Sequence, residues 1–142
     1  MVRGCYIDGK EMADVEKTEK ITVNLGVVDL GEIDLLVREG FYANRTDFIR
    51  IAIRAQLATR ATAVEQTVAR KTLVLGTRRY ARRDLEELRA AGHTIDIRVL
   101  GLAVIAEDVS AELARATIAA VEVLGAFRAS EAVKAALADR IV

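Results

Sequence analysis

Lys20, Thr22 and Asn24 are the side chains whose types and spacing are best suited to binding chemistry in this chain. They alternate with apolar residues over Lys20–Leu25, so an extended backbone puts the polar side chains on one face and the apolar ones on the other. Their ammonium, hydroxyl and carboxamide groups all form hydrogen bonds. This stretch, called the alternating segment below, is predicted to be a short strand with a polar binding face.

The alternating segment needs a strand partner that the neighbouring sequence does not supply. So short a strand is not stable alone, and no hairpin turn lies beside it. Its apolar face must also be covered. We therefore expect the same segment of a second copy to be the partner, which predicts a homodimer.

Two helices are predicted directly after the alternating segment. The first is expected to have Asp29 as its N-cap and to end at Gly40 in a left-handed C-cap. Its apolar residues have helical spacing: Leu30, Ile33, Leu36 and Val37.

The second helix is expected to begin after Asn44, a good N-cap, with Asp47 at the capping-box position. Its apolar stripe comprises Phe48, Ile49, Ala52, Ile53 and Leu57. The helix either continues to about Val68 or breaks near residues 59–62 into a linker helix.

Three similar tetrapeptides recur in the second half of the chain: Leu73–Gly76, Arg98–Gly101 and Glu122–Gly125. We expect each to be a short strand that ends at its glycine and is followed by a turn and a helix, with the helices best seen in residues 84–91, 110–116 and 130–138. Such a unit cannot bury its own apolar face, so stacking into a solenoid with parallel strands is predicted. The alternative is a chance similarity within an ordinary small α/β domain.

The expected fold class is α+β, with four parts along the chain. Residues 1–19 are polar and without period, which predicts a flexible arm. Residues 20–58 form the strand-helix-helix module, residues 59–71 a helical linker, and residues 72–142 the β/α repeat domain.

Arg78, Arg79, Arg82 and Arg83 form the densest local charge cluster. On a helix their spacing would put them on adjoining rows of one face. Such a patch could contact DNA phosphates or a partner's acidic surface, or be balanced by acidic side chains of its own chain: Asp84, Glu86 and Glu87.

Composition excludes several classes of function. The chain has one cysteine, Cys5, and one histidine, His93, which excludes an internal disulfide and a cysteine-rich zinc site. There is no glycine-rich phosphate loop and no candidate catalytic set, so we expect no enzyme activity, no metal and no cofactor. No apolar run is long enough to span a membrane, and no signal peptide is evident, which predicts a cytoplasmic protein. The formal net charge is zero, so any nucleic-acid binding must depend on local geometry.

Residues Lys20–Leu57 resemble the ribbon-helix-helix repressors of the Arc, MetJ and CopG kind. The resemblance rests on the alternating segment, on Glu32–Val37, and on the run Gly40-Phe41-Tyr42-Ala43-Asn44-Arg45-Thr46-Asp47-Phe48-Ile49-Arg50. It covers about a quarter of the chain. The sequence departs from the family pattern at Gly26, where many members carry proline, which affects the shape of the turn.

The resemblance implies that two chains pair their strands into an antiparallel ribbon that lies in the DNA major groove. Lys20, Thr22 and Asn24 would then contact bases, which suits their chemistry. The start of the second helix would hold the phosphate backbone through Asn44, Arg45 and Thr46. The implied partner is double-stranded DNA with a palindromic or repeated operator.

Three alternatives remain open at this stage. The first is an antitoxin that also autoregulates its operon, although residues 72–142 have the pattern of a packed domain. The second is a ligand-sensing repressor, and the scarcity of histidine argues against a metal ligand. The third is an assembly protein that polymerises, or forms a higher oligomer, through its repeat domain.

Overall fold

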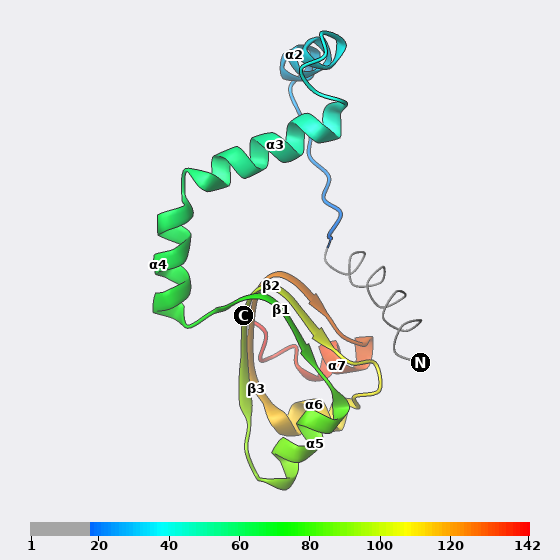
Figure 1. The fold of residues 1–142 in the computed structure, drawn as a ribbon. Helices are drawn as coiled ribbons and strands as arrows, with labels where there is room; N and C mark the ends of the chain where they lie inside the picture. The colour runs from blue at the N-terminus through cyan, green and yellow to red at the C-terminus, as the bar shows by residue number, and fades with distance from the viewer. Residues whose placement is uncertain (1–17) are drawn as a thin grey trace, which may run out of the picture. The chain divides into compact units, whose positions relative to one another are not determined.

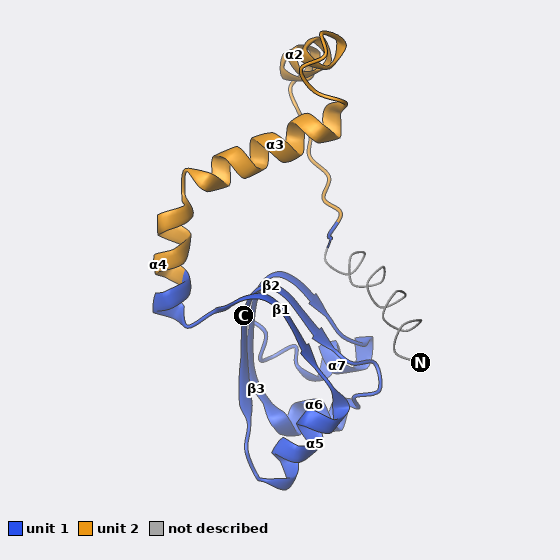
Figure 2. Cartoon of the chain, viewed as in Figure 1, with its two compact units in different colours: residues 1–19, 68–142 blue, residues 20–67 orange. Residues whose placement is uncertain are grey.

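The structure is a computed structural model and describes residues 18–142. Most of the predicted arm, with Cys5, lies outside the described residues. The chain divides into two compact units (Figure 2). Lys20–Thr67 is the N-terminal unit; Val68–Val142 is the main part of the C-terminal unit, which also includes Thr18 and Glu19.

Three helices follow the alternating segment: α2 (Val27–Arg38), α3 (Arg45–Ala58) and α4 (Ala61–Lys71) (Figure 1). A turn at Thr59 and Arg60 separates α3 from α4. Of the two expected outcomes for this stretch, the break into a separate helix is therefore the one observed. None of the described helices is long and apolar enough to cross a membrane.

Helix α2 begins earlier than predicted. Its N-cap is Gly26, not Asp29, and the amide of Leu30 donates to the Gly26 carbonyl oxygen at 3.0 Å. Asp29 instead lies in the first turn, where the helix dipole favours a carboxylate. An aspartate near the start of a helix can therefore be either the N-cap or a residue of the first turn, and the sequence alone does not distinguish the two positions.

The end of α2 is as predicted. Gly40 has a φ of +85°, and its amide donates to the Val37 carbonyl oxygen at 3.1 Å. The amide of Phe41 donates to Leu36 at 3.0 Å. This pair of bonds is the Schellman arrangement, which satisfies carbonyl groups that the helix leaves without a partner.

The C-terminal unit contains a parallel sheet in which the strand order is β1-β2-β3. One helix follows each strand along the chain, so the unit is a run of three β/α pairs (Figure 1). The pairs are β1 (Val74–Tyr80) with α5 (Arg82–Ala90), β2 (Ile95–Ile105) with α6 (Ala111–Thr117), and β3 (Ile118–Arg128) with α7 (Glu131–Ala136). The predicted parallel pairing of the strands is confirmed, in a mixed α/β fold.

The repeated tetrapeptides lie side by side in the sheet, because Gly76, Gly101 and Gly125 are paired in register. The prediction that each strand ends at its glycine is wrong. The strands continue through the glycines. Each glycine has a positive φ, between +114° and +135°. A Cβ at Gly101 would overlap the carbonyl oxygen of Gly76, and one at Gly125 would overlap that of Gly101. Glycine therefore allows close backbone approach within the sheet, not a turn after it.

A single cluster of buried apolar side chains lies at the centre of the C-terminal unit. It combines residues of β2 and β3 with residues of all three helices, and its largest fully buried members are Leu85, Ile97, Ile105, Ile118 and Leu137. Thr117 is buried too, and its hydroxyl donates to the Leu113 carbonyl oxygen at 2.8 Å. The unit thus has a core of its own within one chain.

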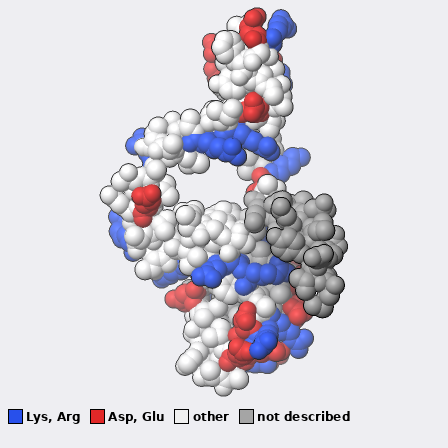
Figure 3. Space-filling view, in the orientation of Figure 1, with Lys and Arg blue, Asp and Glu red and all other residues white. Residues whose placement is uncertain are grey.

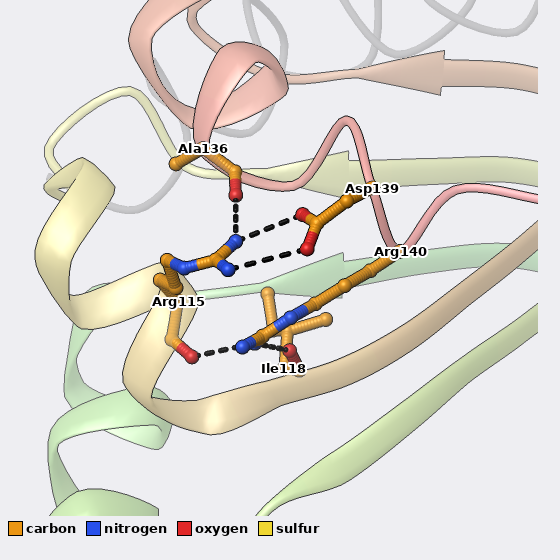
Figure 4. Close-up of polar contacts among 5 residues, drawn as sticks. All are labelled: Arg115, Ile118, Ala136, Asp139 and Arg140. Carbon is orange, nitrogen blue, oxygen red and sulfur yellow. Dashed lines mark hydrogen bonds and ion pairs between the residues drawn. The ribbon is translucent and has the colours of Figure 1, made fainter.

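Two arginines hold the C-terminal segment to α6 and to the start of β3 (Figure 4). Arg115 binds both carboxylate oxygens of Asp139, at 2.8 and 3.2 Å, and Arg140 donates to the Arg115 carbonyl oxygen at 2.6 Å. These contacts position Ile141 to form a parallel bridge with Val121 of β3. Part of the β3 edge is therefore covered by the chain's own end.

Candidate nucleic-acid interface

The alternating segment is exposed on both faces. Lys20, Thr22 and Asn24 are exposed, as a binding role requires. The apolar side chains on the other face are exposed as well, with 73% of Ile21 and 66% of Val23 accessible. Within the described chain no strand pairs with this segment, so one copy leaves both its backbone and its apolar face without cover.

The helices of the N-terminal unit have little core of their own. Ile33 is the one buried residue of α2, and α3 has none. Large apolar side chains on these helices and their connecting turn are exposed: Val27, Val28, Leu35, Phe41, Ile49, Ile51, Ile53 and Leu57. The apolar stripe predicted for α3 is thus largely uncovered in a single chain, and burial against another copy stays a prediction.

The start of α3 has the predicted capping box. The Asn44 side-chain oxygen accepts from the Asp47 amide at 2.8 Å, and the Asp47 carboxylate accepts from the Ala43 amide at 3.1 Å. In the described chain, the amides of Arg45 and Thr46 have no hydrogen-bond acceptor. Two donors at the positive end of a 14-residue helix are therefore available to an anion.

The Arg45 side chain is engaged by an aspartate that the sequence did not suggest. Its Nε and Nη2 atoms bind the two carboxylate oxygens of Asp34 on α2, both at 2.7 Å. This hydrogen bonding lowers the pKa of Asp34 and raises that of Arg45. The pair ties α2 to α3 and leaves Nη1 of Arg45 outside the bidentate contact. No spacing rule connects residues eleven apart across a turn.

The predicted arginine patch does not lie on one helix. Arg78 and Arg79 are on β1, whereas Arg82 and Arg83 are in the first turn of α5. The prediction of a single helical face is wrong because β1 continues through Gly76 to Tyr80.

The two helical arginines are paired within α5. Arg82 binds Glu86 at 2.8 Å, and Arg83 binds Glu87 at 3.1 Å, both at i,i+4 spacing. Hydrogen bonding to Glu86 raises the pKa of Arg82. The charges of Arg82 and Arg83 are thus balanced by acidic side chains of the same chain, which is the last of the possibilities given in the sequence analysis.

Charge of both signs is spread over the surface. In the view of Figure 3, basic and acidic side chains occur on both units. Among residues 18–142, no three His, Cys, Asp or Glu side chains gather as a metal site would require. Local donors, not bulk charge, are what this surface offers to an anionic partner.

Comparison with known proteins assigns the chain to a family. No curated protein and no solved structure matches it. The family model described as the ribbon-helix-helix transcriptional regulator family matches residues 16–134, a range that includes the alternating segment, α2, α3 and the whole three-stranded sheet. The chain therefore belongs to the ribbon-helix-helix transcriptional regulator family.

Proposed function

We propose that two copies of this protein bind an operator as a sequence-specific transcriptional repressor. The observation that carries the proposal is the alternating segment, which is exposed on both faces and lacks a strand partner in the described chain. Antiparallel pairing of two copies satisfies the backbone and directs one apolar face inward. The opposite face then presents two sets of polar side chains to the major groove.

The base-contacting side chains are proposed to be Lys20, Thr22 and Asn24. Lysine donates to the acceptors of guanine, asparagine pairs with adenine through two hydrogen bonds, and threonine contacts a thymine methyl or donates a hydrogen bond. A two-fold dimer presents these groups twice, which favours a palindromic or tandemly repeated operator.

Phosphate binding is proposed for the start of α3. The amides of Arg45 and Thr46 lie at the positive end of the helix, and the Asn44 cap fixes their direction. Arg45 adds the Nη1 donor that Asp34 does not use. Such contacts set the register on DNA without reading sequence.

The C-terminal unit is proposed to be a short solenoid that sets assembly or contacts a partner. Its in-register glycines and its self-sufficient core support this role. The same core argues against an antitoxin with a disordered C-terminal segment. No catalytic role is proposed, and a DNA target implies action in the cytoplasm.

Selection of bound sequences from a random DNA pool tests the proposal. We expect the wild-type protein to enrich a palindromic or repeated site. Asn24→Ala should relax the preference at one position per half-site and cost about 1 to 3 kcal/mol there. Arg45→Ala, the matched comparison, should weaken all sequences alike and reduce the salt dependence by roughly one ion. Unchanged specificity in Asn24→Ala would show that the base-contacting assignment is wrong.

A further inference from the structure

A cavity of about 720 Å³ lies at the carboxyl ends of the parallel strands in the C-terminal unit. Its lining combines charged and apolar residues from the strand ends and the loops that follow β2 and β3: Arg79, Val104, Ile105, Ala106, Glu107, Asp108, Arg128, Ala129 and Ser130. This size is typical of sites for small molecules. The DNA-binding role proposed above does not use this cavity.

Two arginines line the cavity on either side of Val104. Arg79 of β1, Val104 of β2 and Arg128 of β3 are paired in one row across the sheet, so their side chains lie on the same face. Neighbouring strands are roughly 5 Å apart, which puts the two arginines within reach of one ligand from opposite sides of Val104. Guanidinium groups in this arrangement are suited to a carboxylate.

The chain itself supplies a carboxylate to Arg128. Nη2 of Arg128 binds the Glu19 carboxylate at 3.2 Å and the Thr18 carbonyl oxygen at 2.8 Å. The Glu19 side chain is 62% exposed and that of Arg128 is 33% exposed, and ion pairs open to solvent contribute little free energy. A ligand with better geometry can therefore displace Glu19.

The other residues that line the cavity indicate which groups the ligand carries besides a carboxylate. Glu107 and Asp108 repel a simple anion but attract an ammonium group, and the partly exposed Ala106 and Ala129 also line the cavity. We propose that this cavity binds a small zwitterion, an aliphatic α-amino acid, with its carboxylate between Arg79 and Arg128. The ammonium group faces Glu107 and Asp108, and the side chain contacts the apolar lining.

Binding at this cavity has a direct route to the alternating segment, because Glu19 immediately precedes Lys20. A ligand carboxylate that replaces Glu19 on Arg128 releases the start of that segment. This regulatory consequence rests on the proposed DNA-binding function, whereas the site itself does not.

Titration calorimetry on the full chain without DNA tests the site, with L-leucine as the probe and 4-methylpentanoate as the matched compound that lacks the ammonium group. We expect L-leucine to bind, and we expect the affinity for 4-methylpentanoate to be lower by at least about tenfold. Arg128→Gln should weaken L-leucine binding by at least about tenfold, whereas Arg83→Gln, on the exposed face of α5, should not change it. Glu19→Ala should tighten binding, since it removes the carboxylate that competes for Arg128.

The possible outcomes test ligand binding in the cavity separately from its proposed effect on DNA binding. Absence of L-leucine binding, or equal binding by wild type and Arg128→Gln with an unchanged unfolding midpoint, overturns the site. If L-leucine binds but leaves the affinity for the selected DNA unchanged, the coupling through Glu19 is overturned. If no DNA is bound at all, the proposed function fails and the calorimetric result still stands.

Discussion

The two units of this protein bury their apolar residues to very different degrees. All of the buried apolar side chains identified in residues 18–142 lie in the C-terminal unit except Ile33. The N-terminal unit instead exposes apolar residues along its extended segment and both of its first two helices. The C-terminal unit has a buried core within a single chain, whereas the N-terminal unit has almost none.

This difference in burial indicates that the two units differ in the source of their stability. A unit that buries its own core contributes stability at any protein concentration. If the unit with an exposed apolar face gains its core by association, as proposed, its folding is coupled to dimerisation. The predictions below test that division, beginning with the largest expected effect.

Gly101→Ala should strongly destabilise the C-terminal unit. Gly101 has a φ of +135°, and a Cβ there would overlap the backbone of the neighbouring strand, which cannot move aside as a side chain would. The conformation costs about 1 to 3 kcal/mol for a residue other than glycine, and the overlap adds roughly 1 to 3 kcal/mol. Urea unfolding followed by circular dichroism measures the loss.

Gly76→Ala is the matched control for that variant. Gly76 has a similar φ, +114°, but an added Cβ would meet nothing within 4 Å. We expect only the conformational part of the cost, about 1 to 3 kcal/mol. Equal losses in the two variants would contradict the close backbone approach described for the glycine row.

Val23→Asp should dissociate the dimer without unfolding the C-terminal unit. Burying a valine side chain is worth about 1.5 kcal/mol or more, and each dimer contains two copies, so the dissociation constant should rise about 100-fold. Sedimentation velocity over a range of concentrations measures it. Thr22→Ala, on the polar face, should leave the dimer intact. A dimer that tolerates Val23→Asp would place the association surface elsewhere.

The smallest expected effect is a loss of folding stability at acid pH. It depends on one Arg–Asp ion pair in each unit. Hydrogen bonding to Arg45 lowers the pKa of Asp34, and hydrogen bonding to Arg115 lowers that of Asp139. The stabilisation is present above the ordinary aspartate pKa of about 3.9 and is lost as the pH falls through the lowered value.

Asn variants test which unit each pair supports. Asp139→Asn should flatten the acid limb of the unfolding curve of the C-terminal unit, and Asp34→Asn should affect only dimer formation. Urea midpoints and sedimentation between about pH 5 and pH 2 provide the two readouts. An effect of Asp34→Asn on the C-terminal unit would contradict the division between the units.

Features governed by local rules could be predicted from the sequence. The Asn44 cap and the Gly40 C-cap each depend on a few neighbouring residues, and both are observed. The parallel strands could be predicted because the glycine of each repeat marks its register.

Features governed by distant partners could not be predicted. The glycines mark a close approach within the sheet, and the same residue type also marks turns, so the sequence predicts strand ends that are too early. The contact between Arg128 and Glu19 joins residues 109 positions apart, and no local sequence pattern predicts it. The base-contacting role of Lys20, Thr22 and Asn24 stays a prediction, because its partner is a second molecule.

A cysteine scan of the alternating segment tests the central claim most directly. Each position from Lys20 to Leu25 is changed to cysteine in a Cys5→Ser background, and mild oxidation is followed by non-reducing electrophoresis. In an antiparallel two-fold ribbon a residue faces its own copy only near the centre, where Cα atoms approach within about 5.5 Å. We predict a disulfide-linked dimer at one or two adjacent central positions and little elsewhere. Equal cross-linking at all six positions, or none at any, would contradict the intermolecular ribbon.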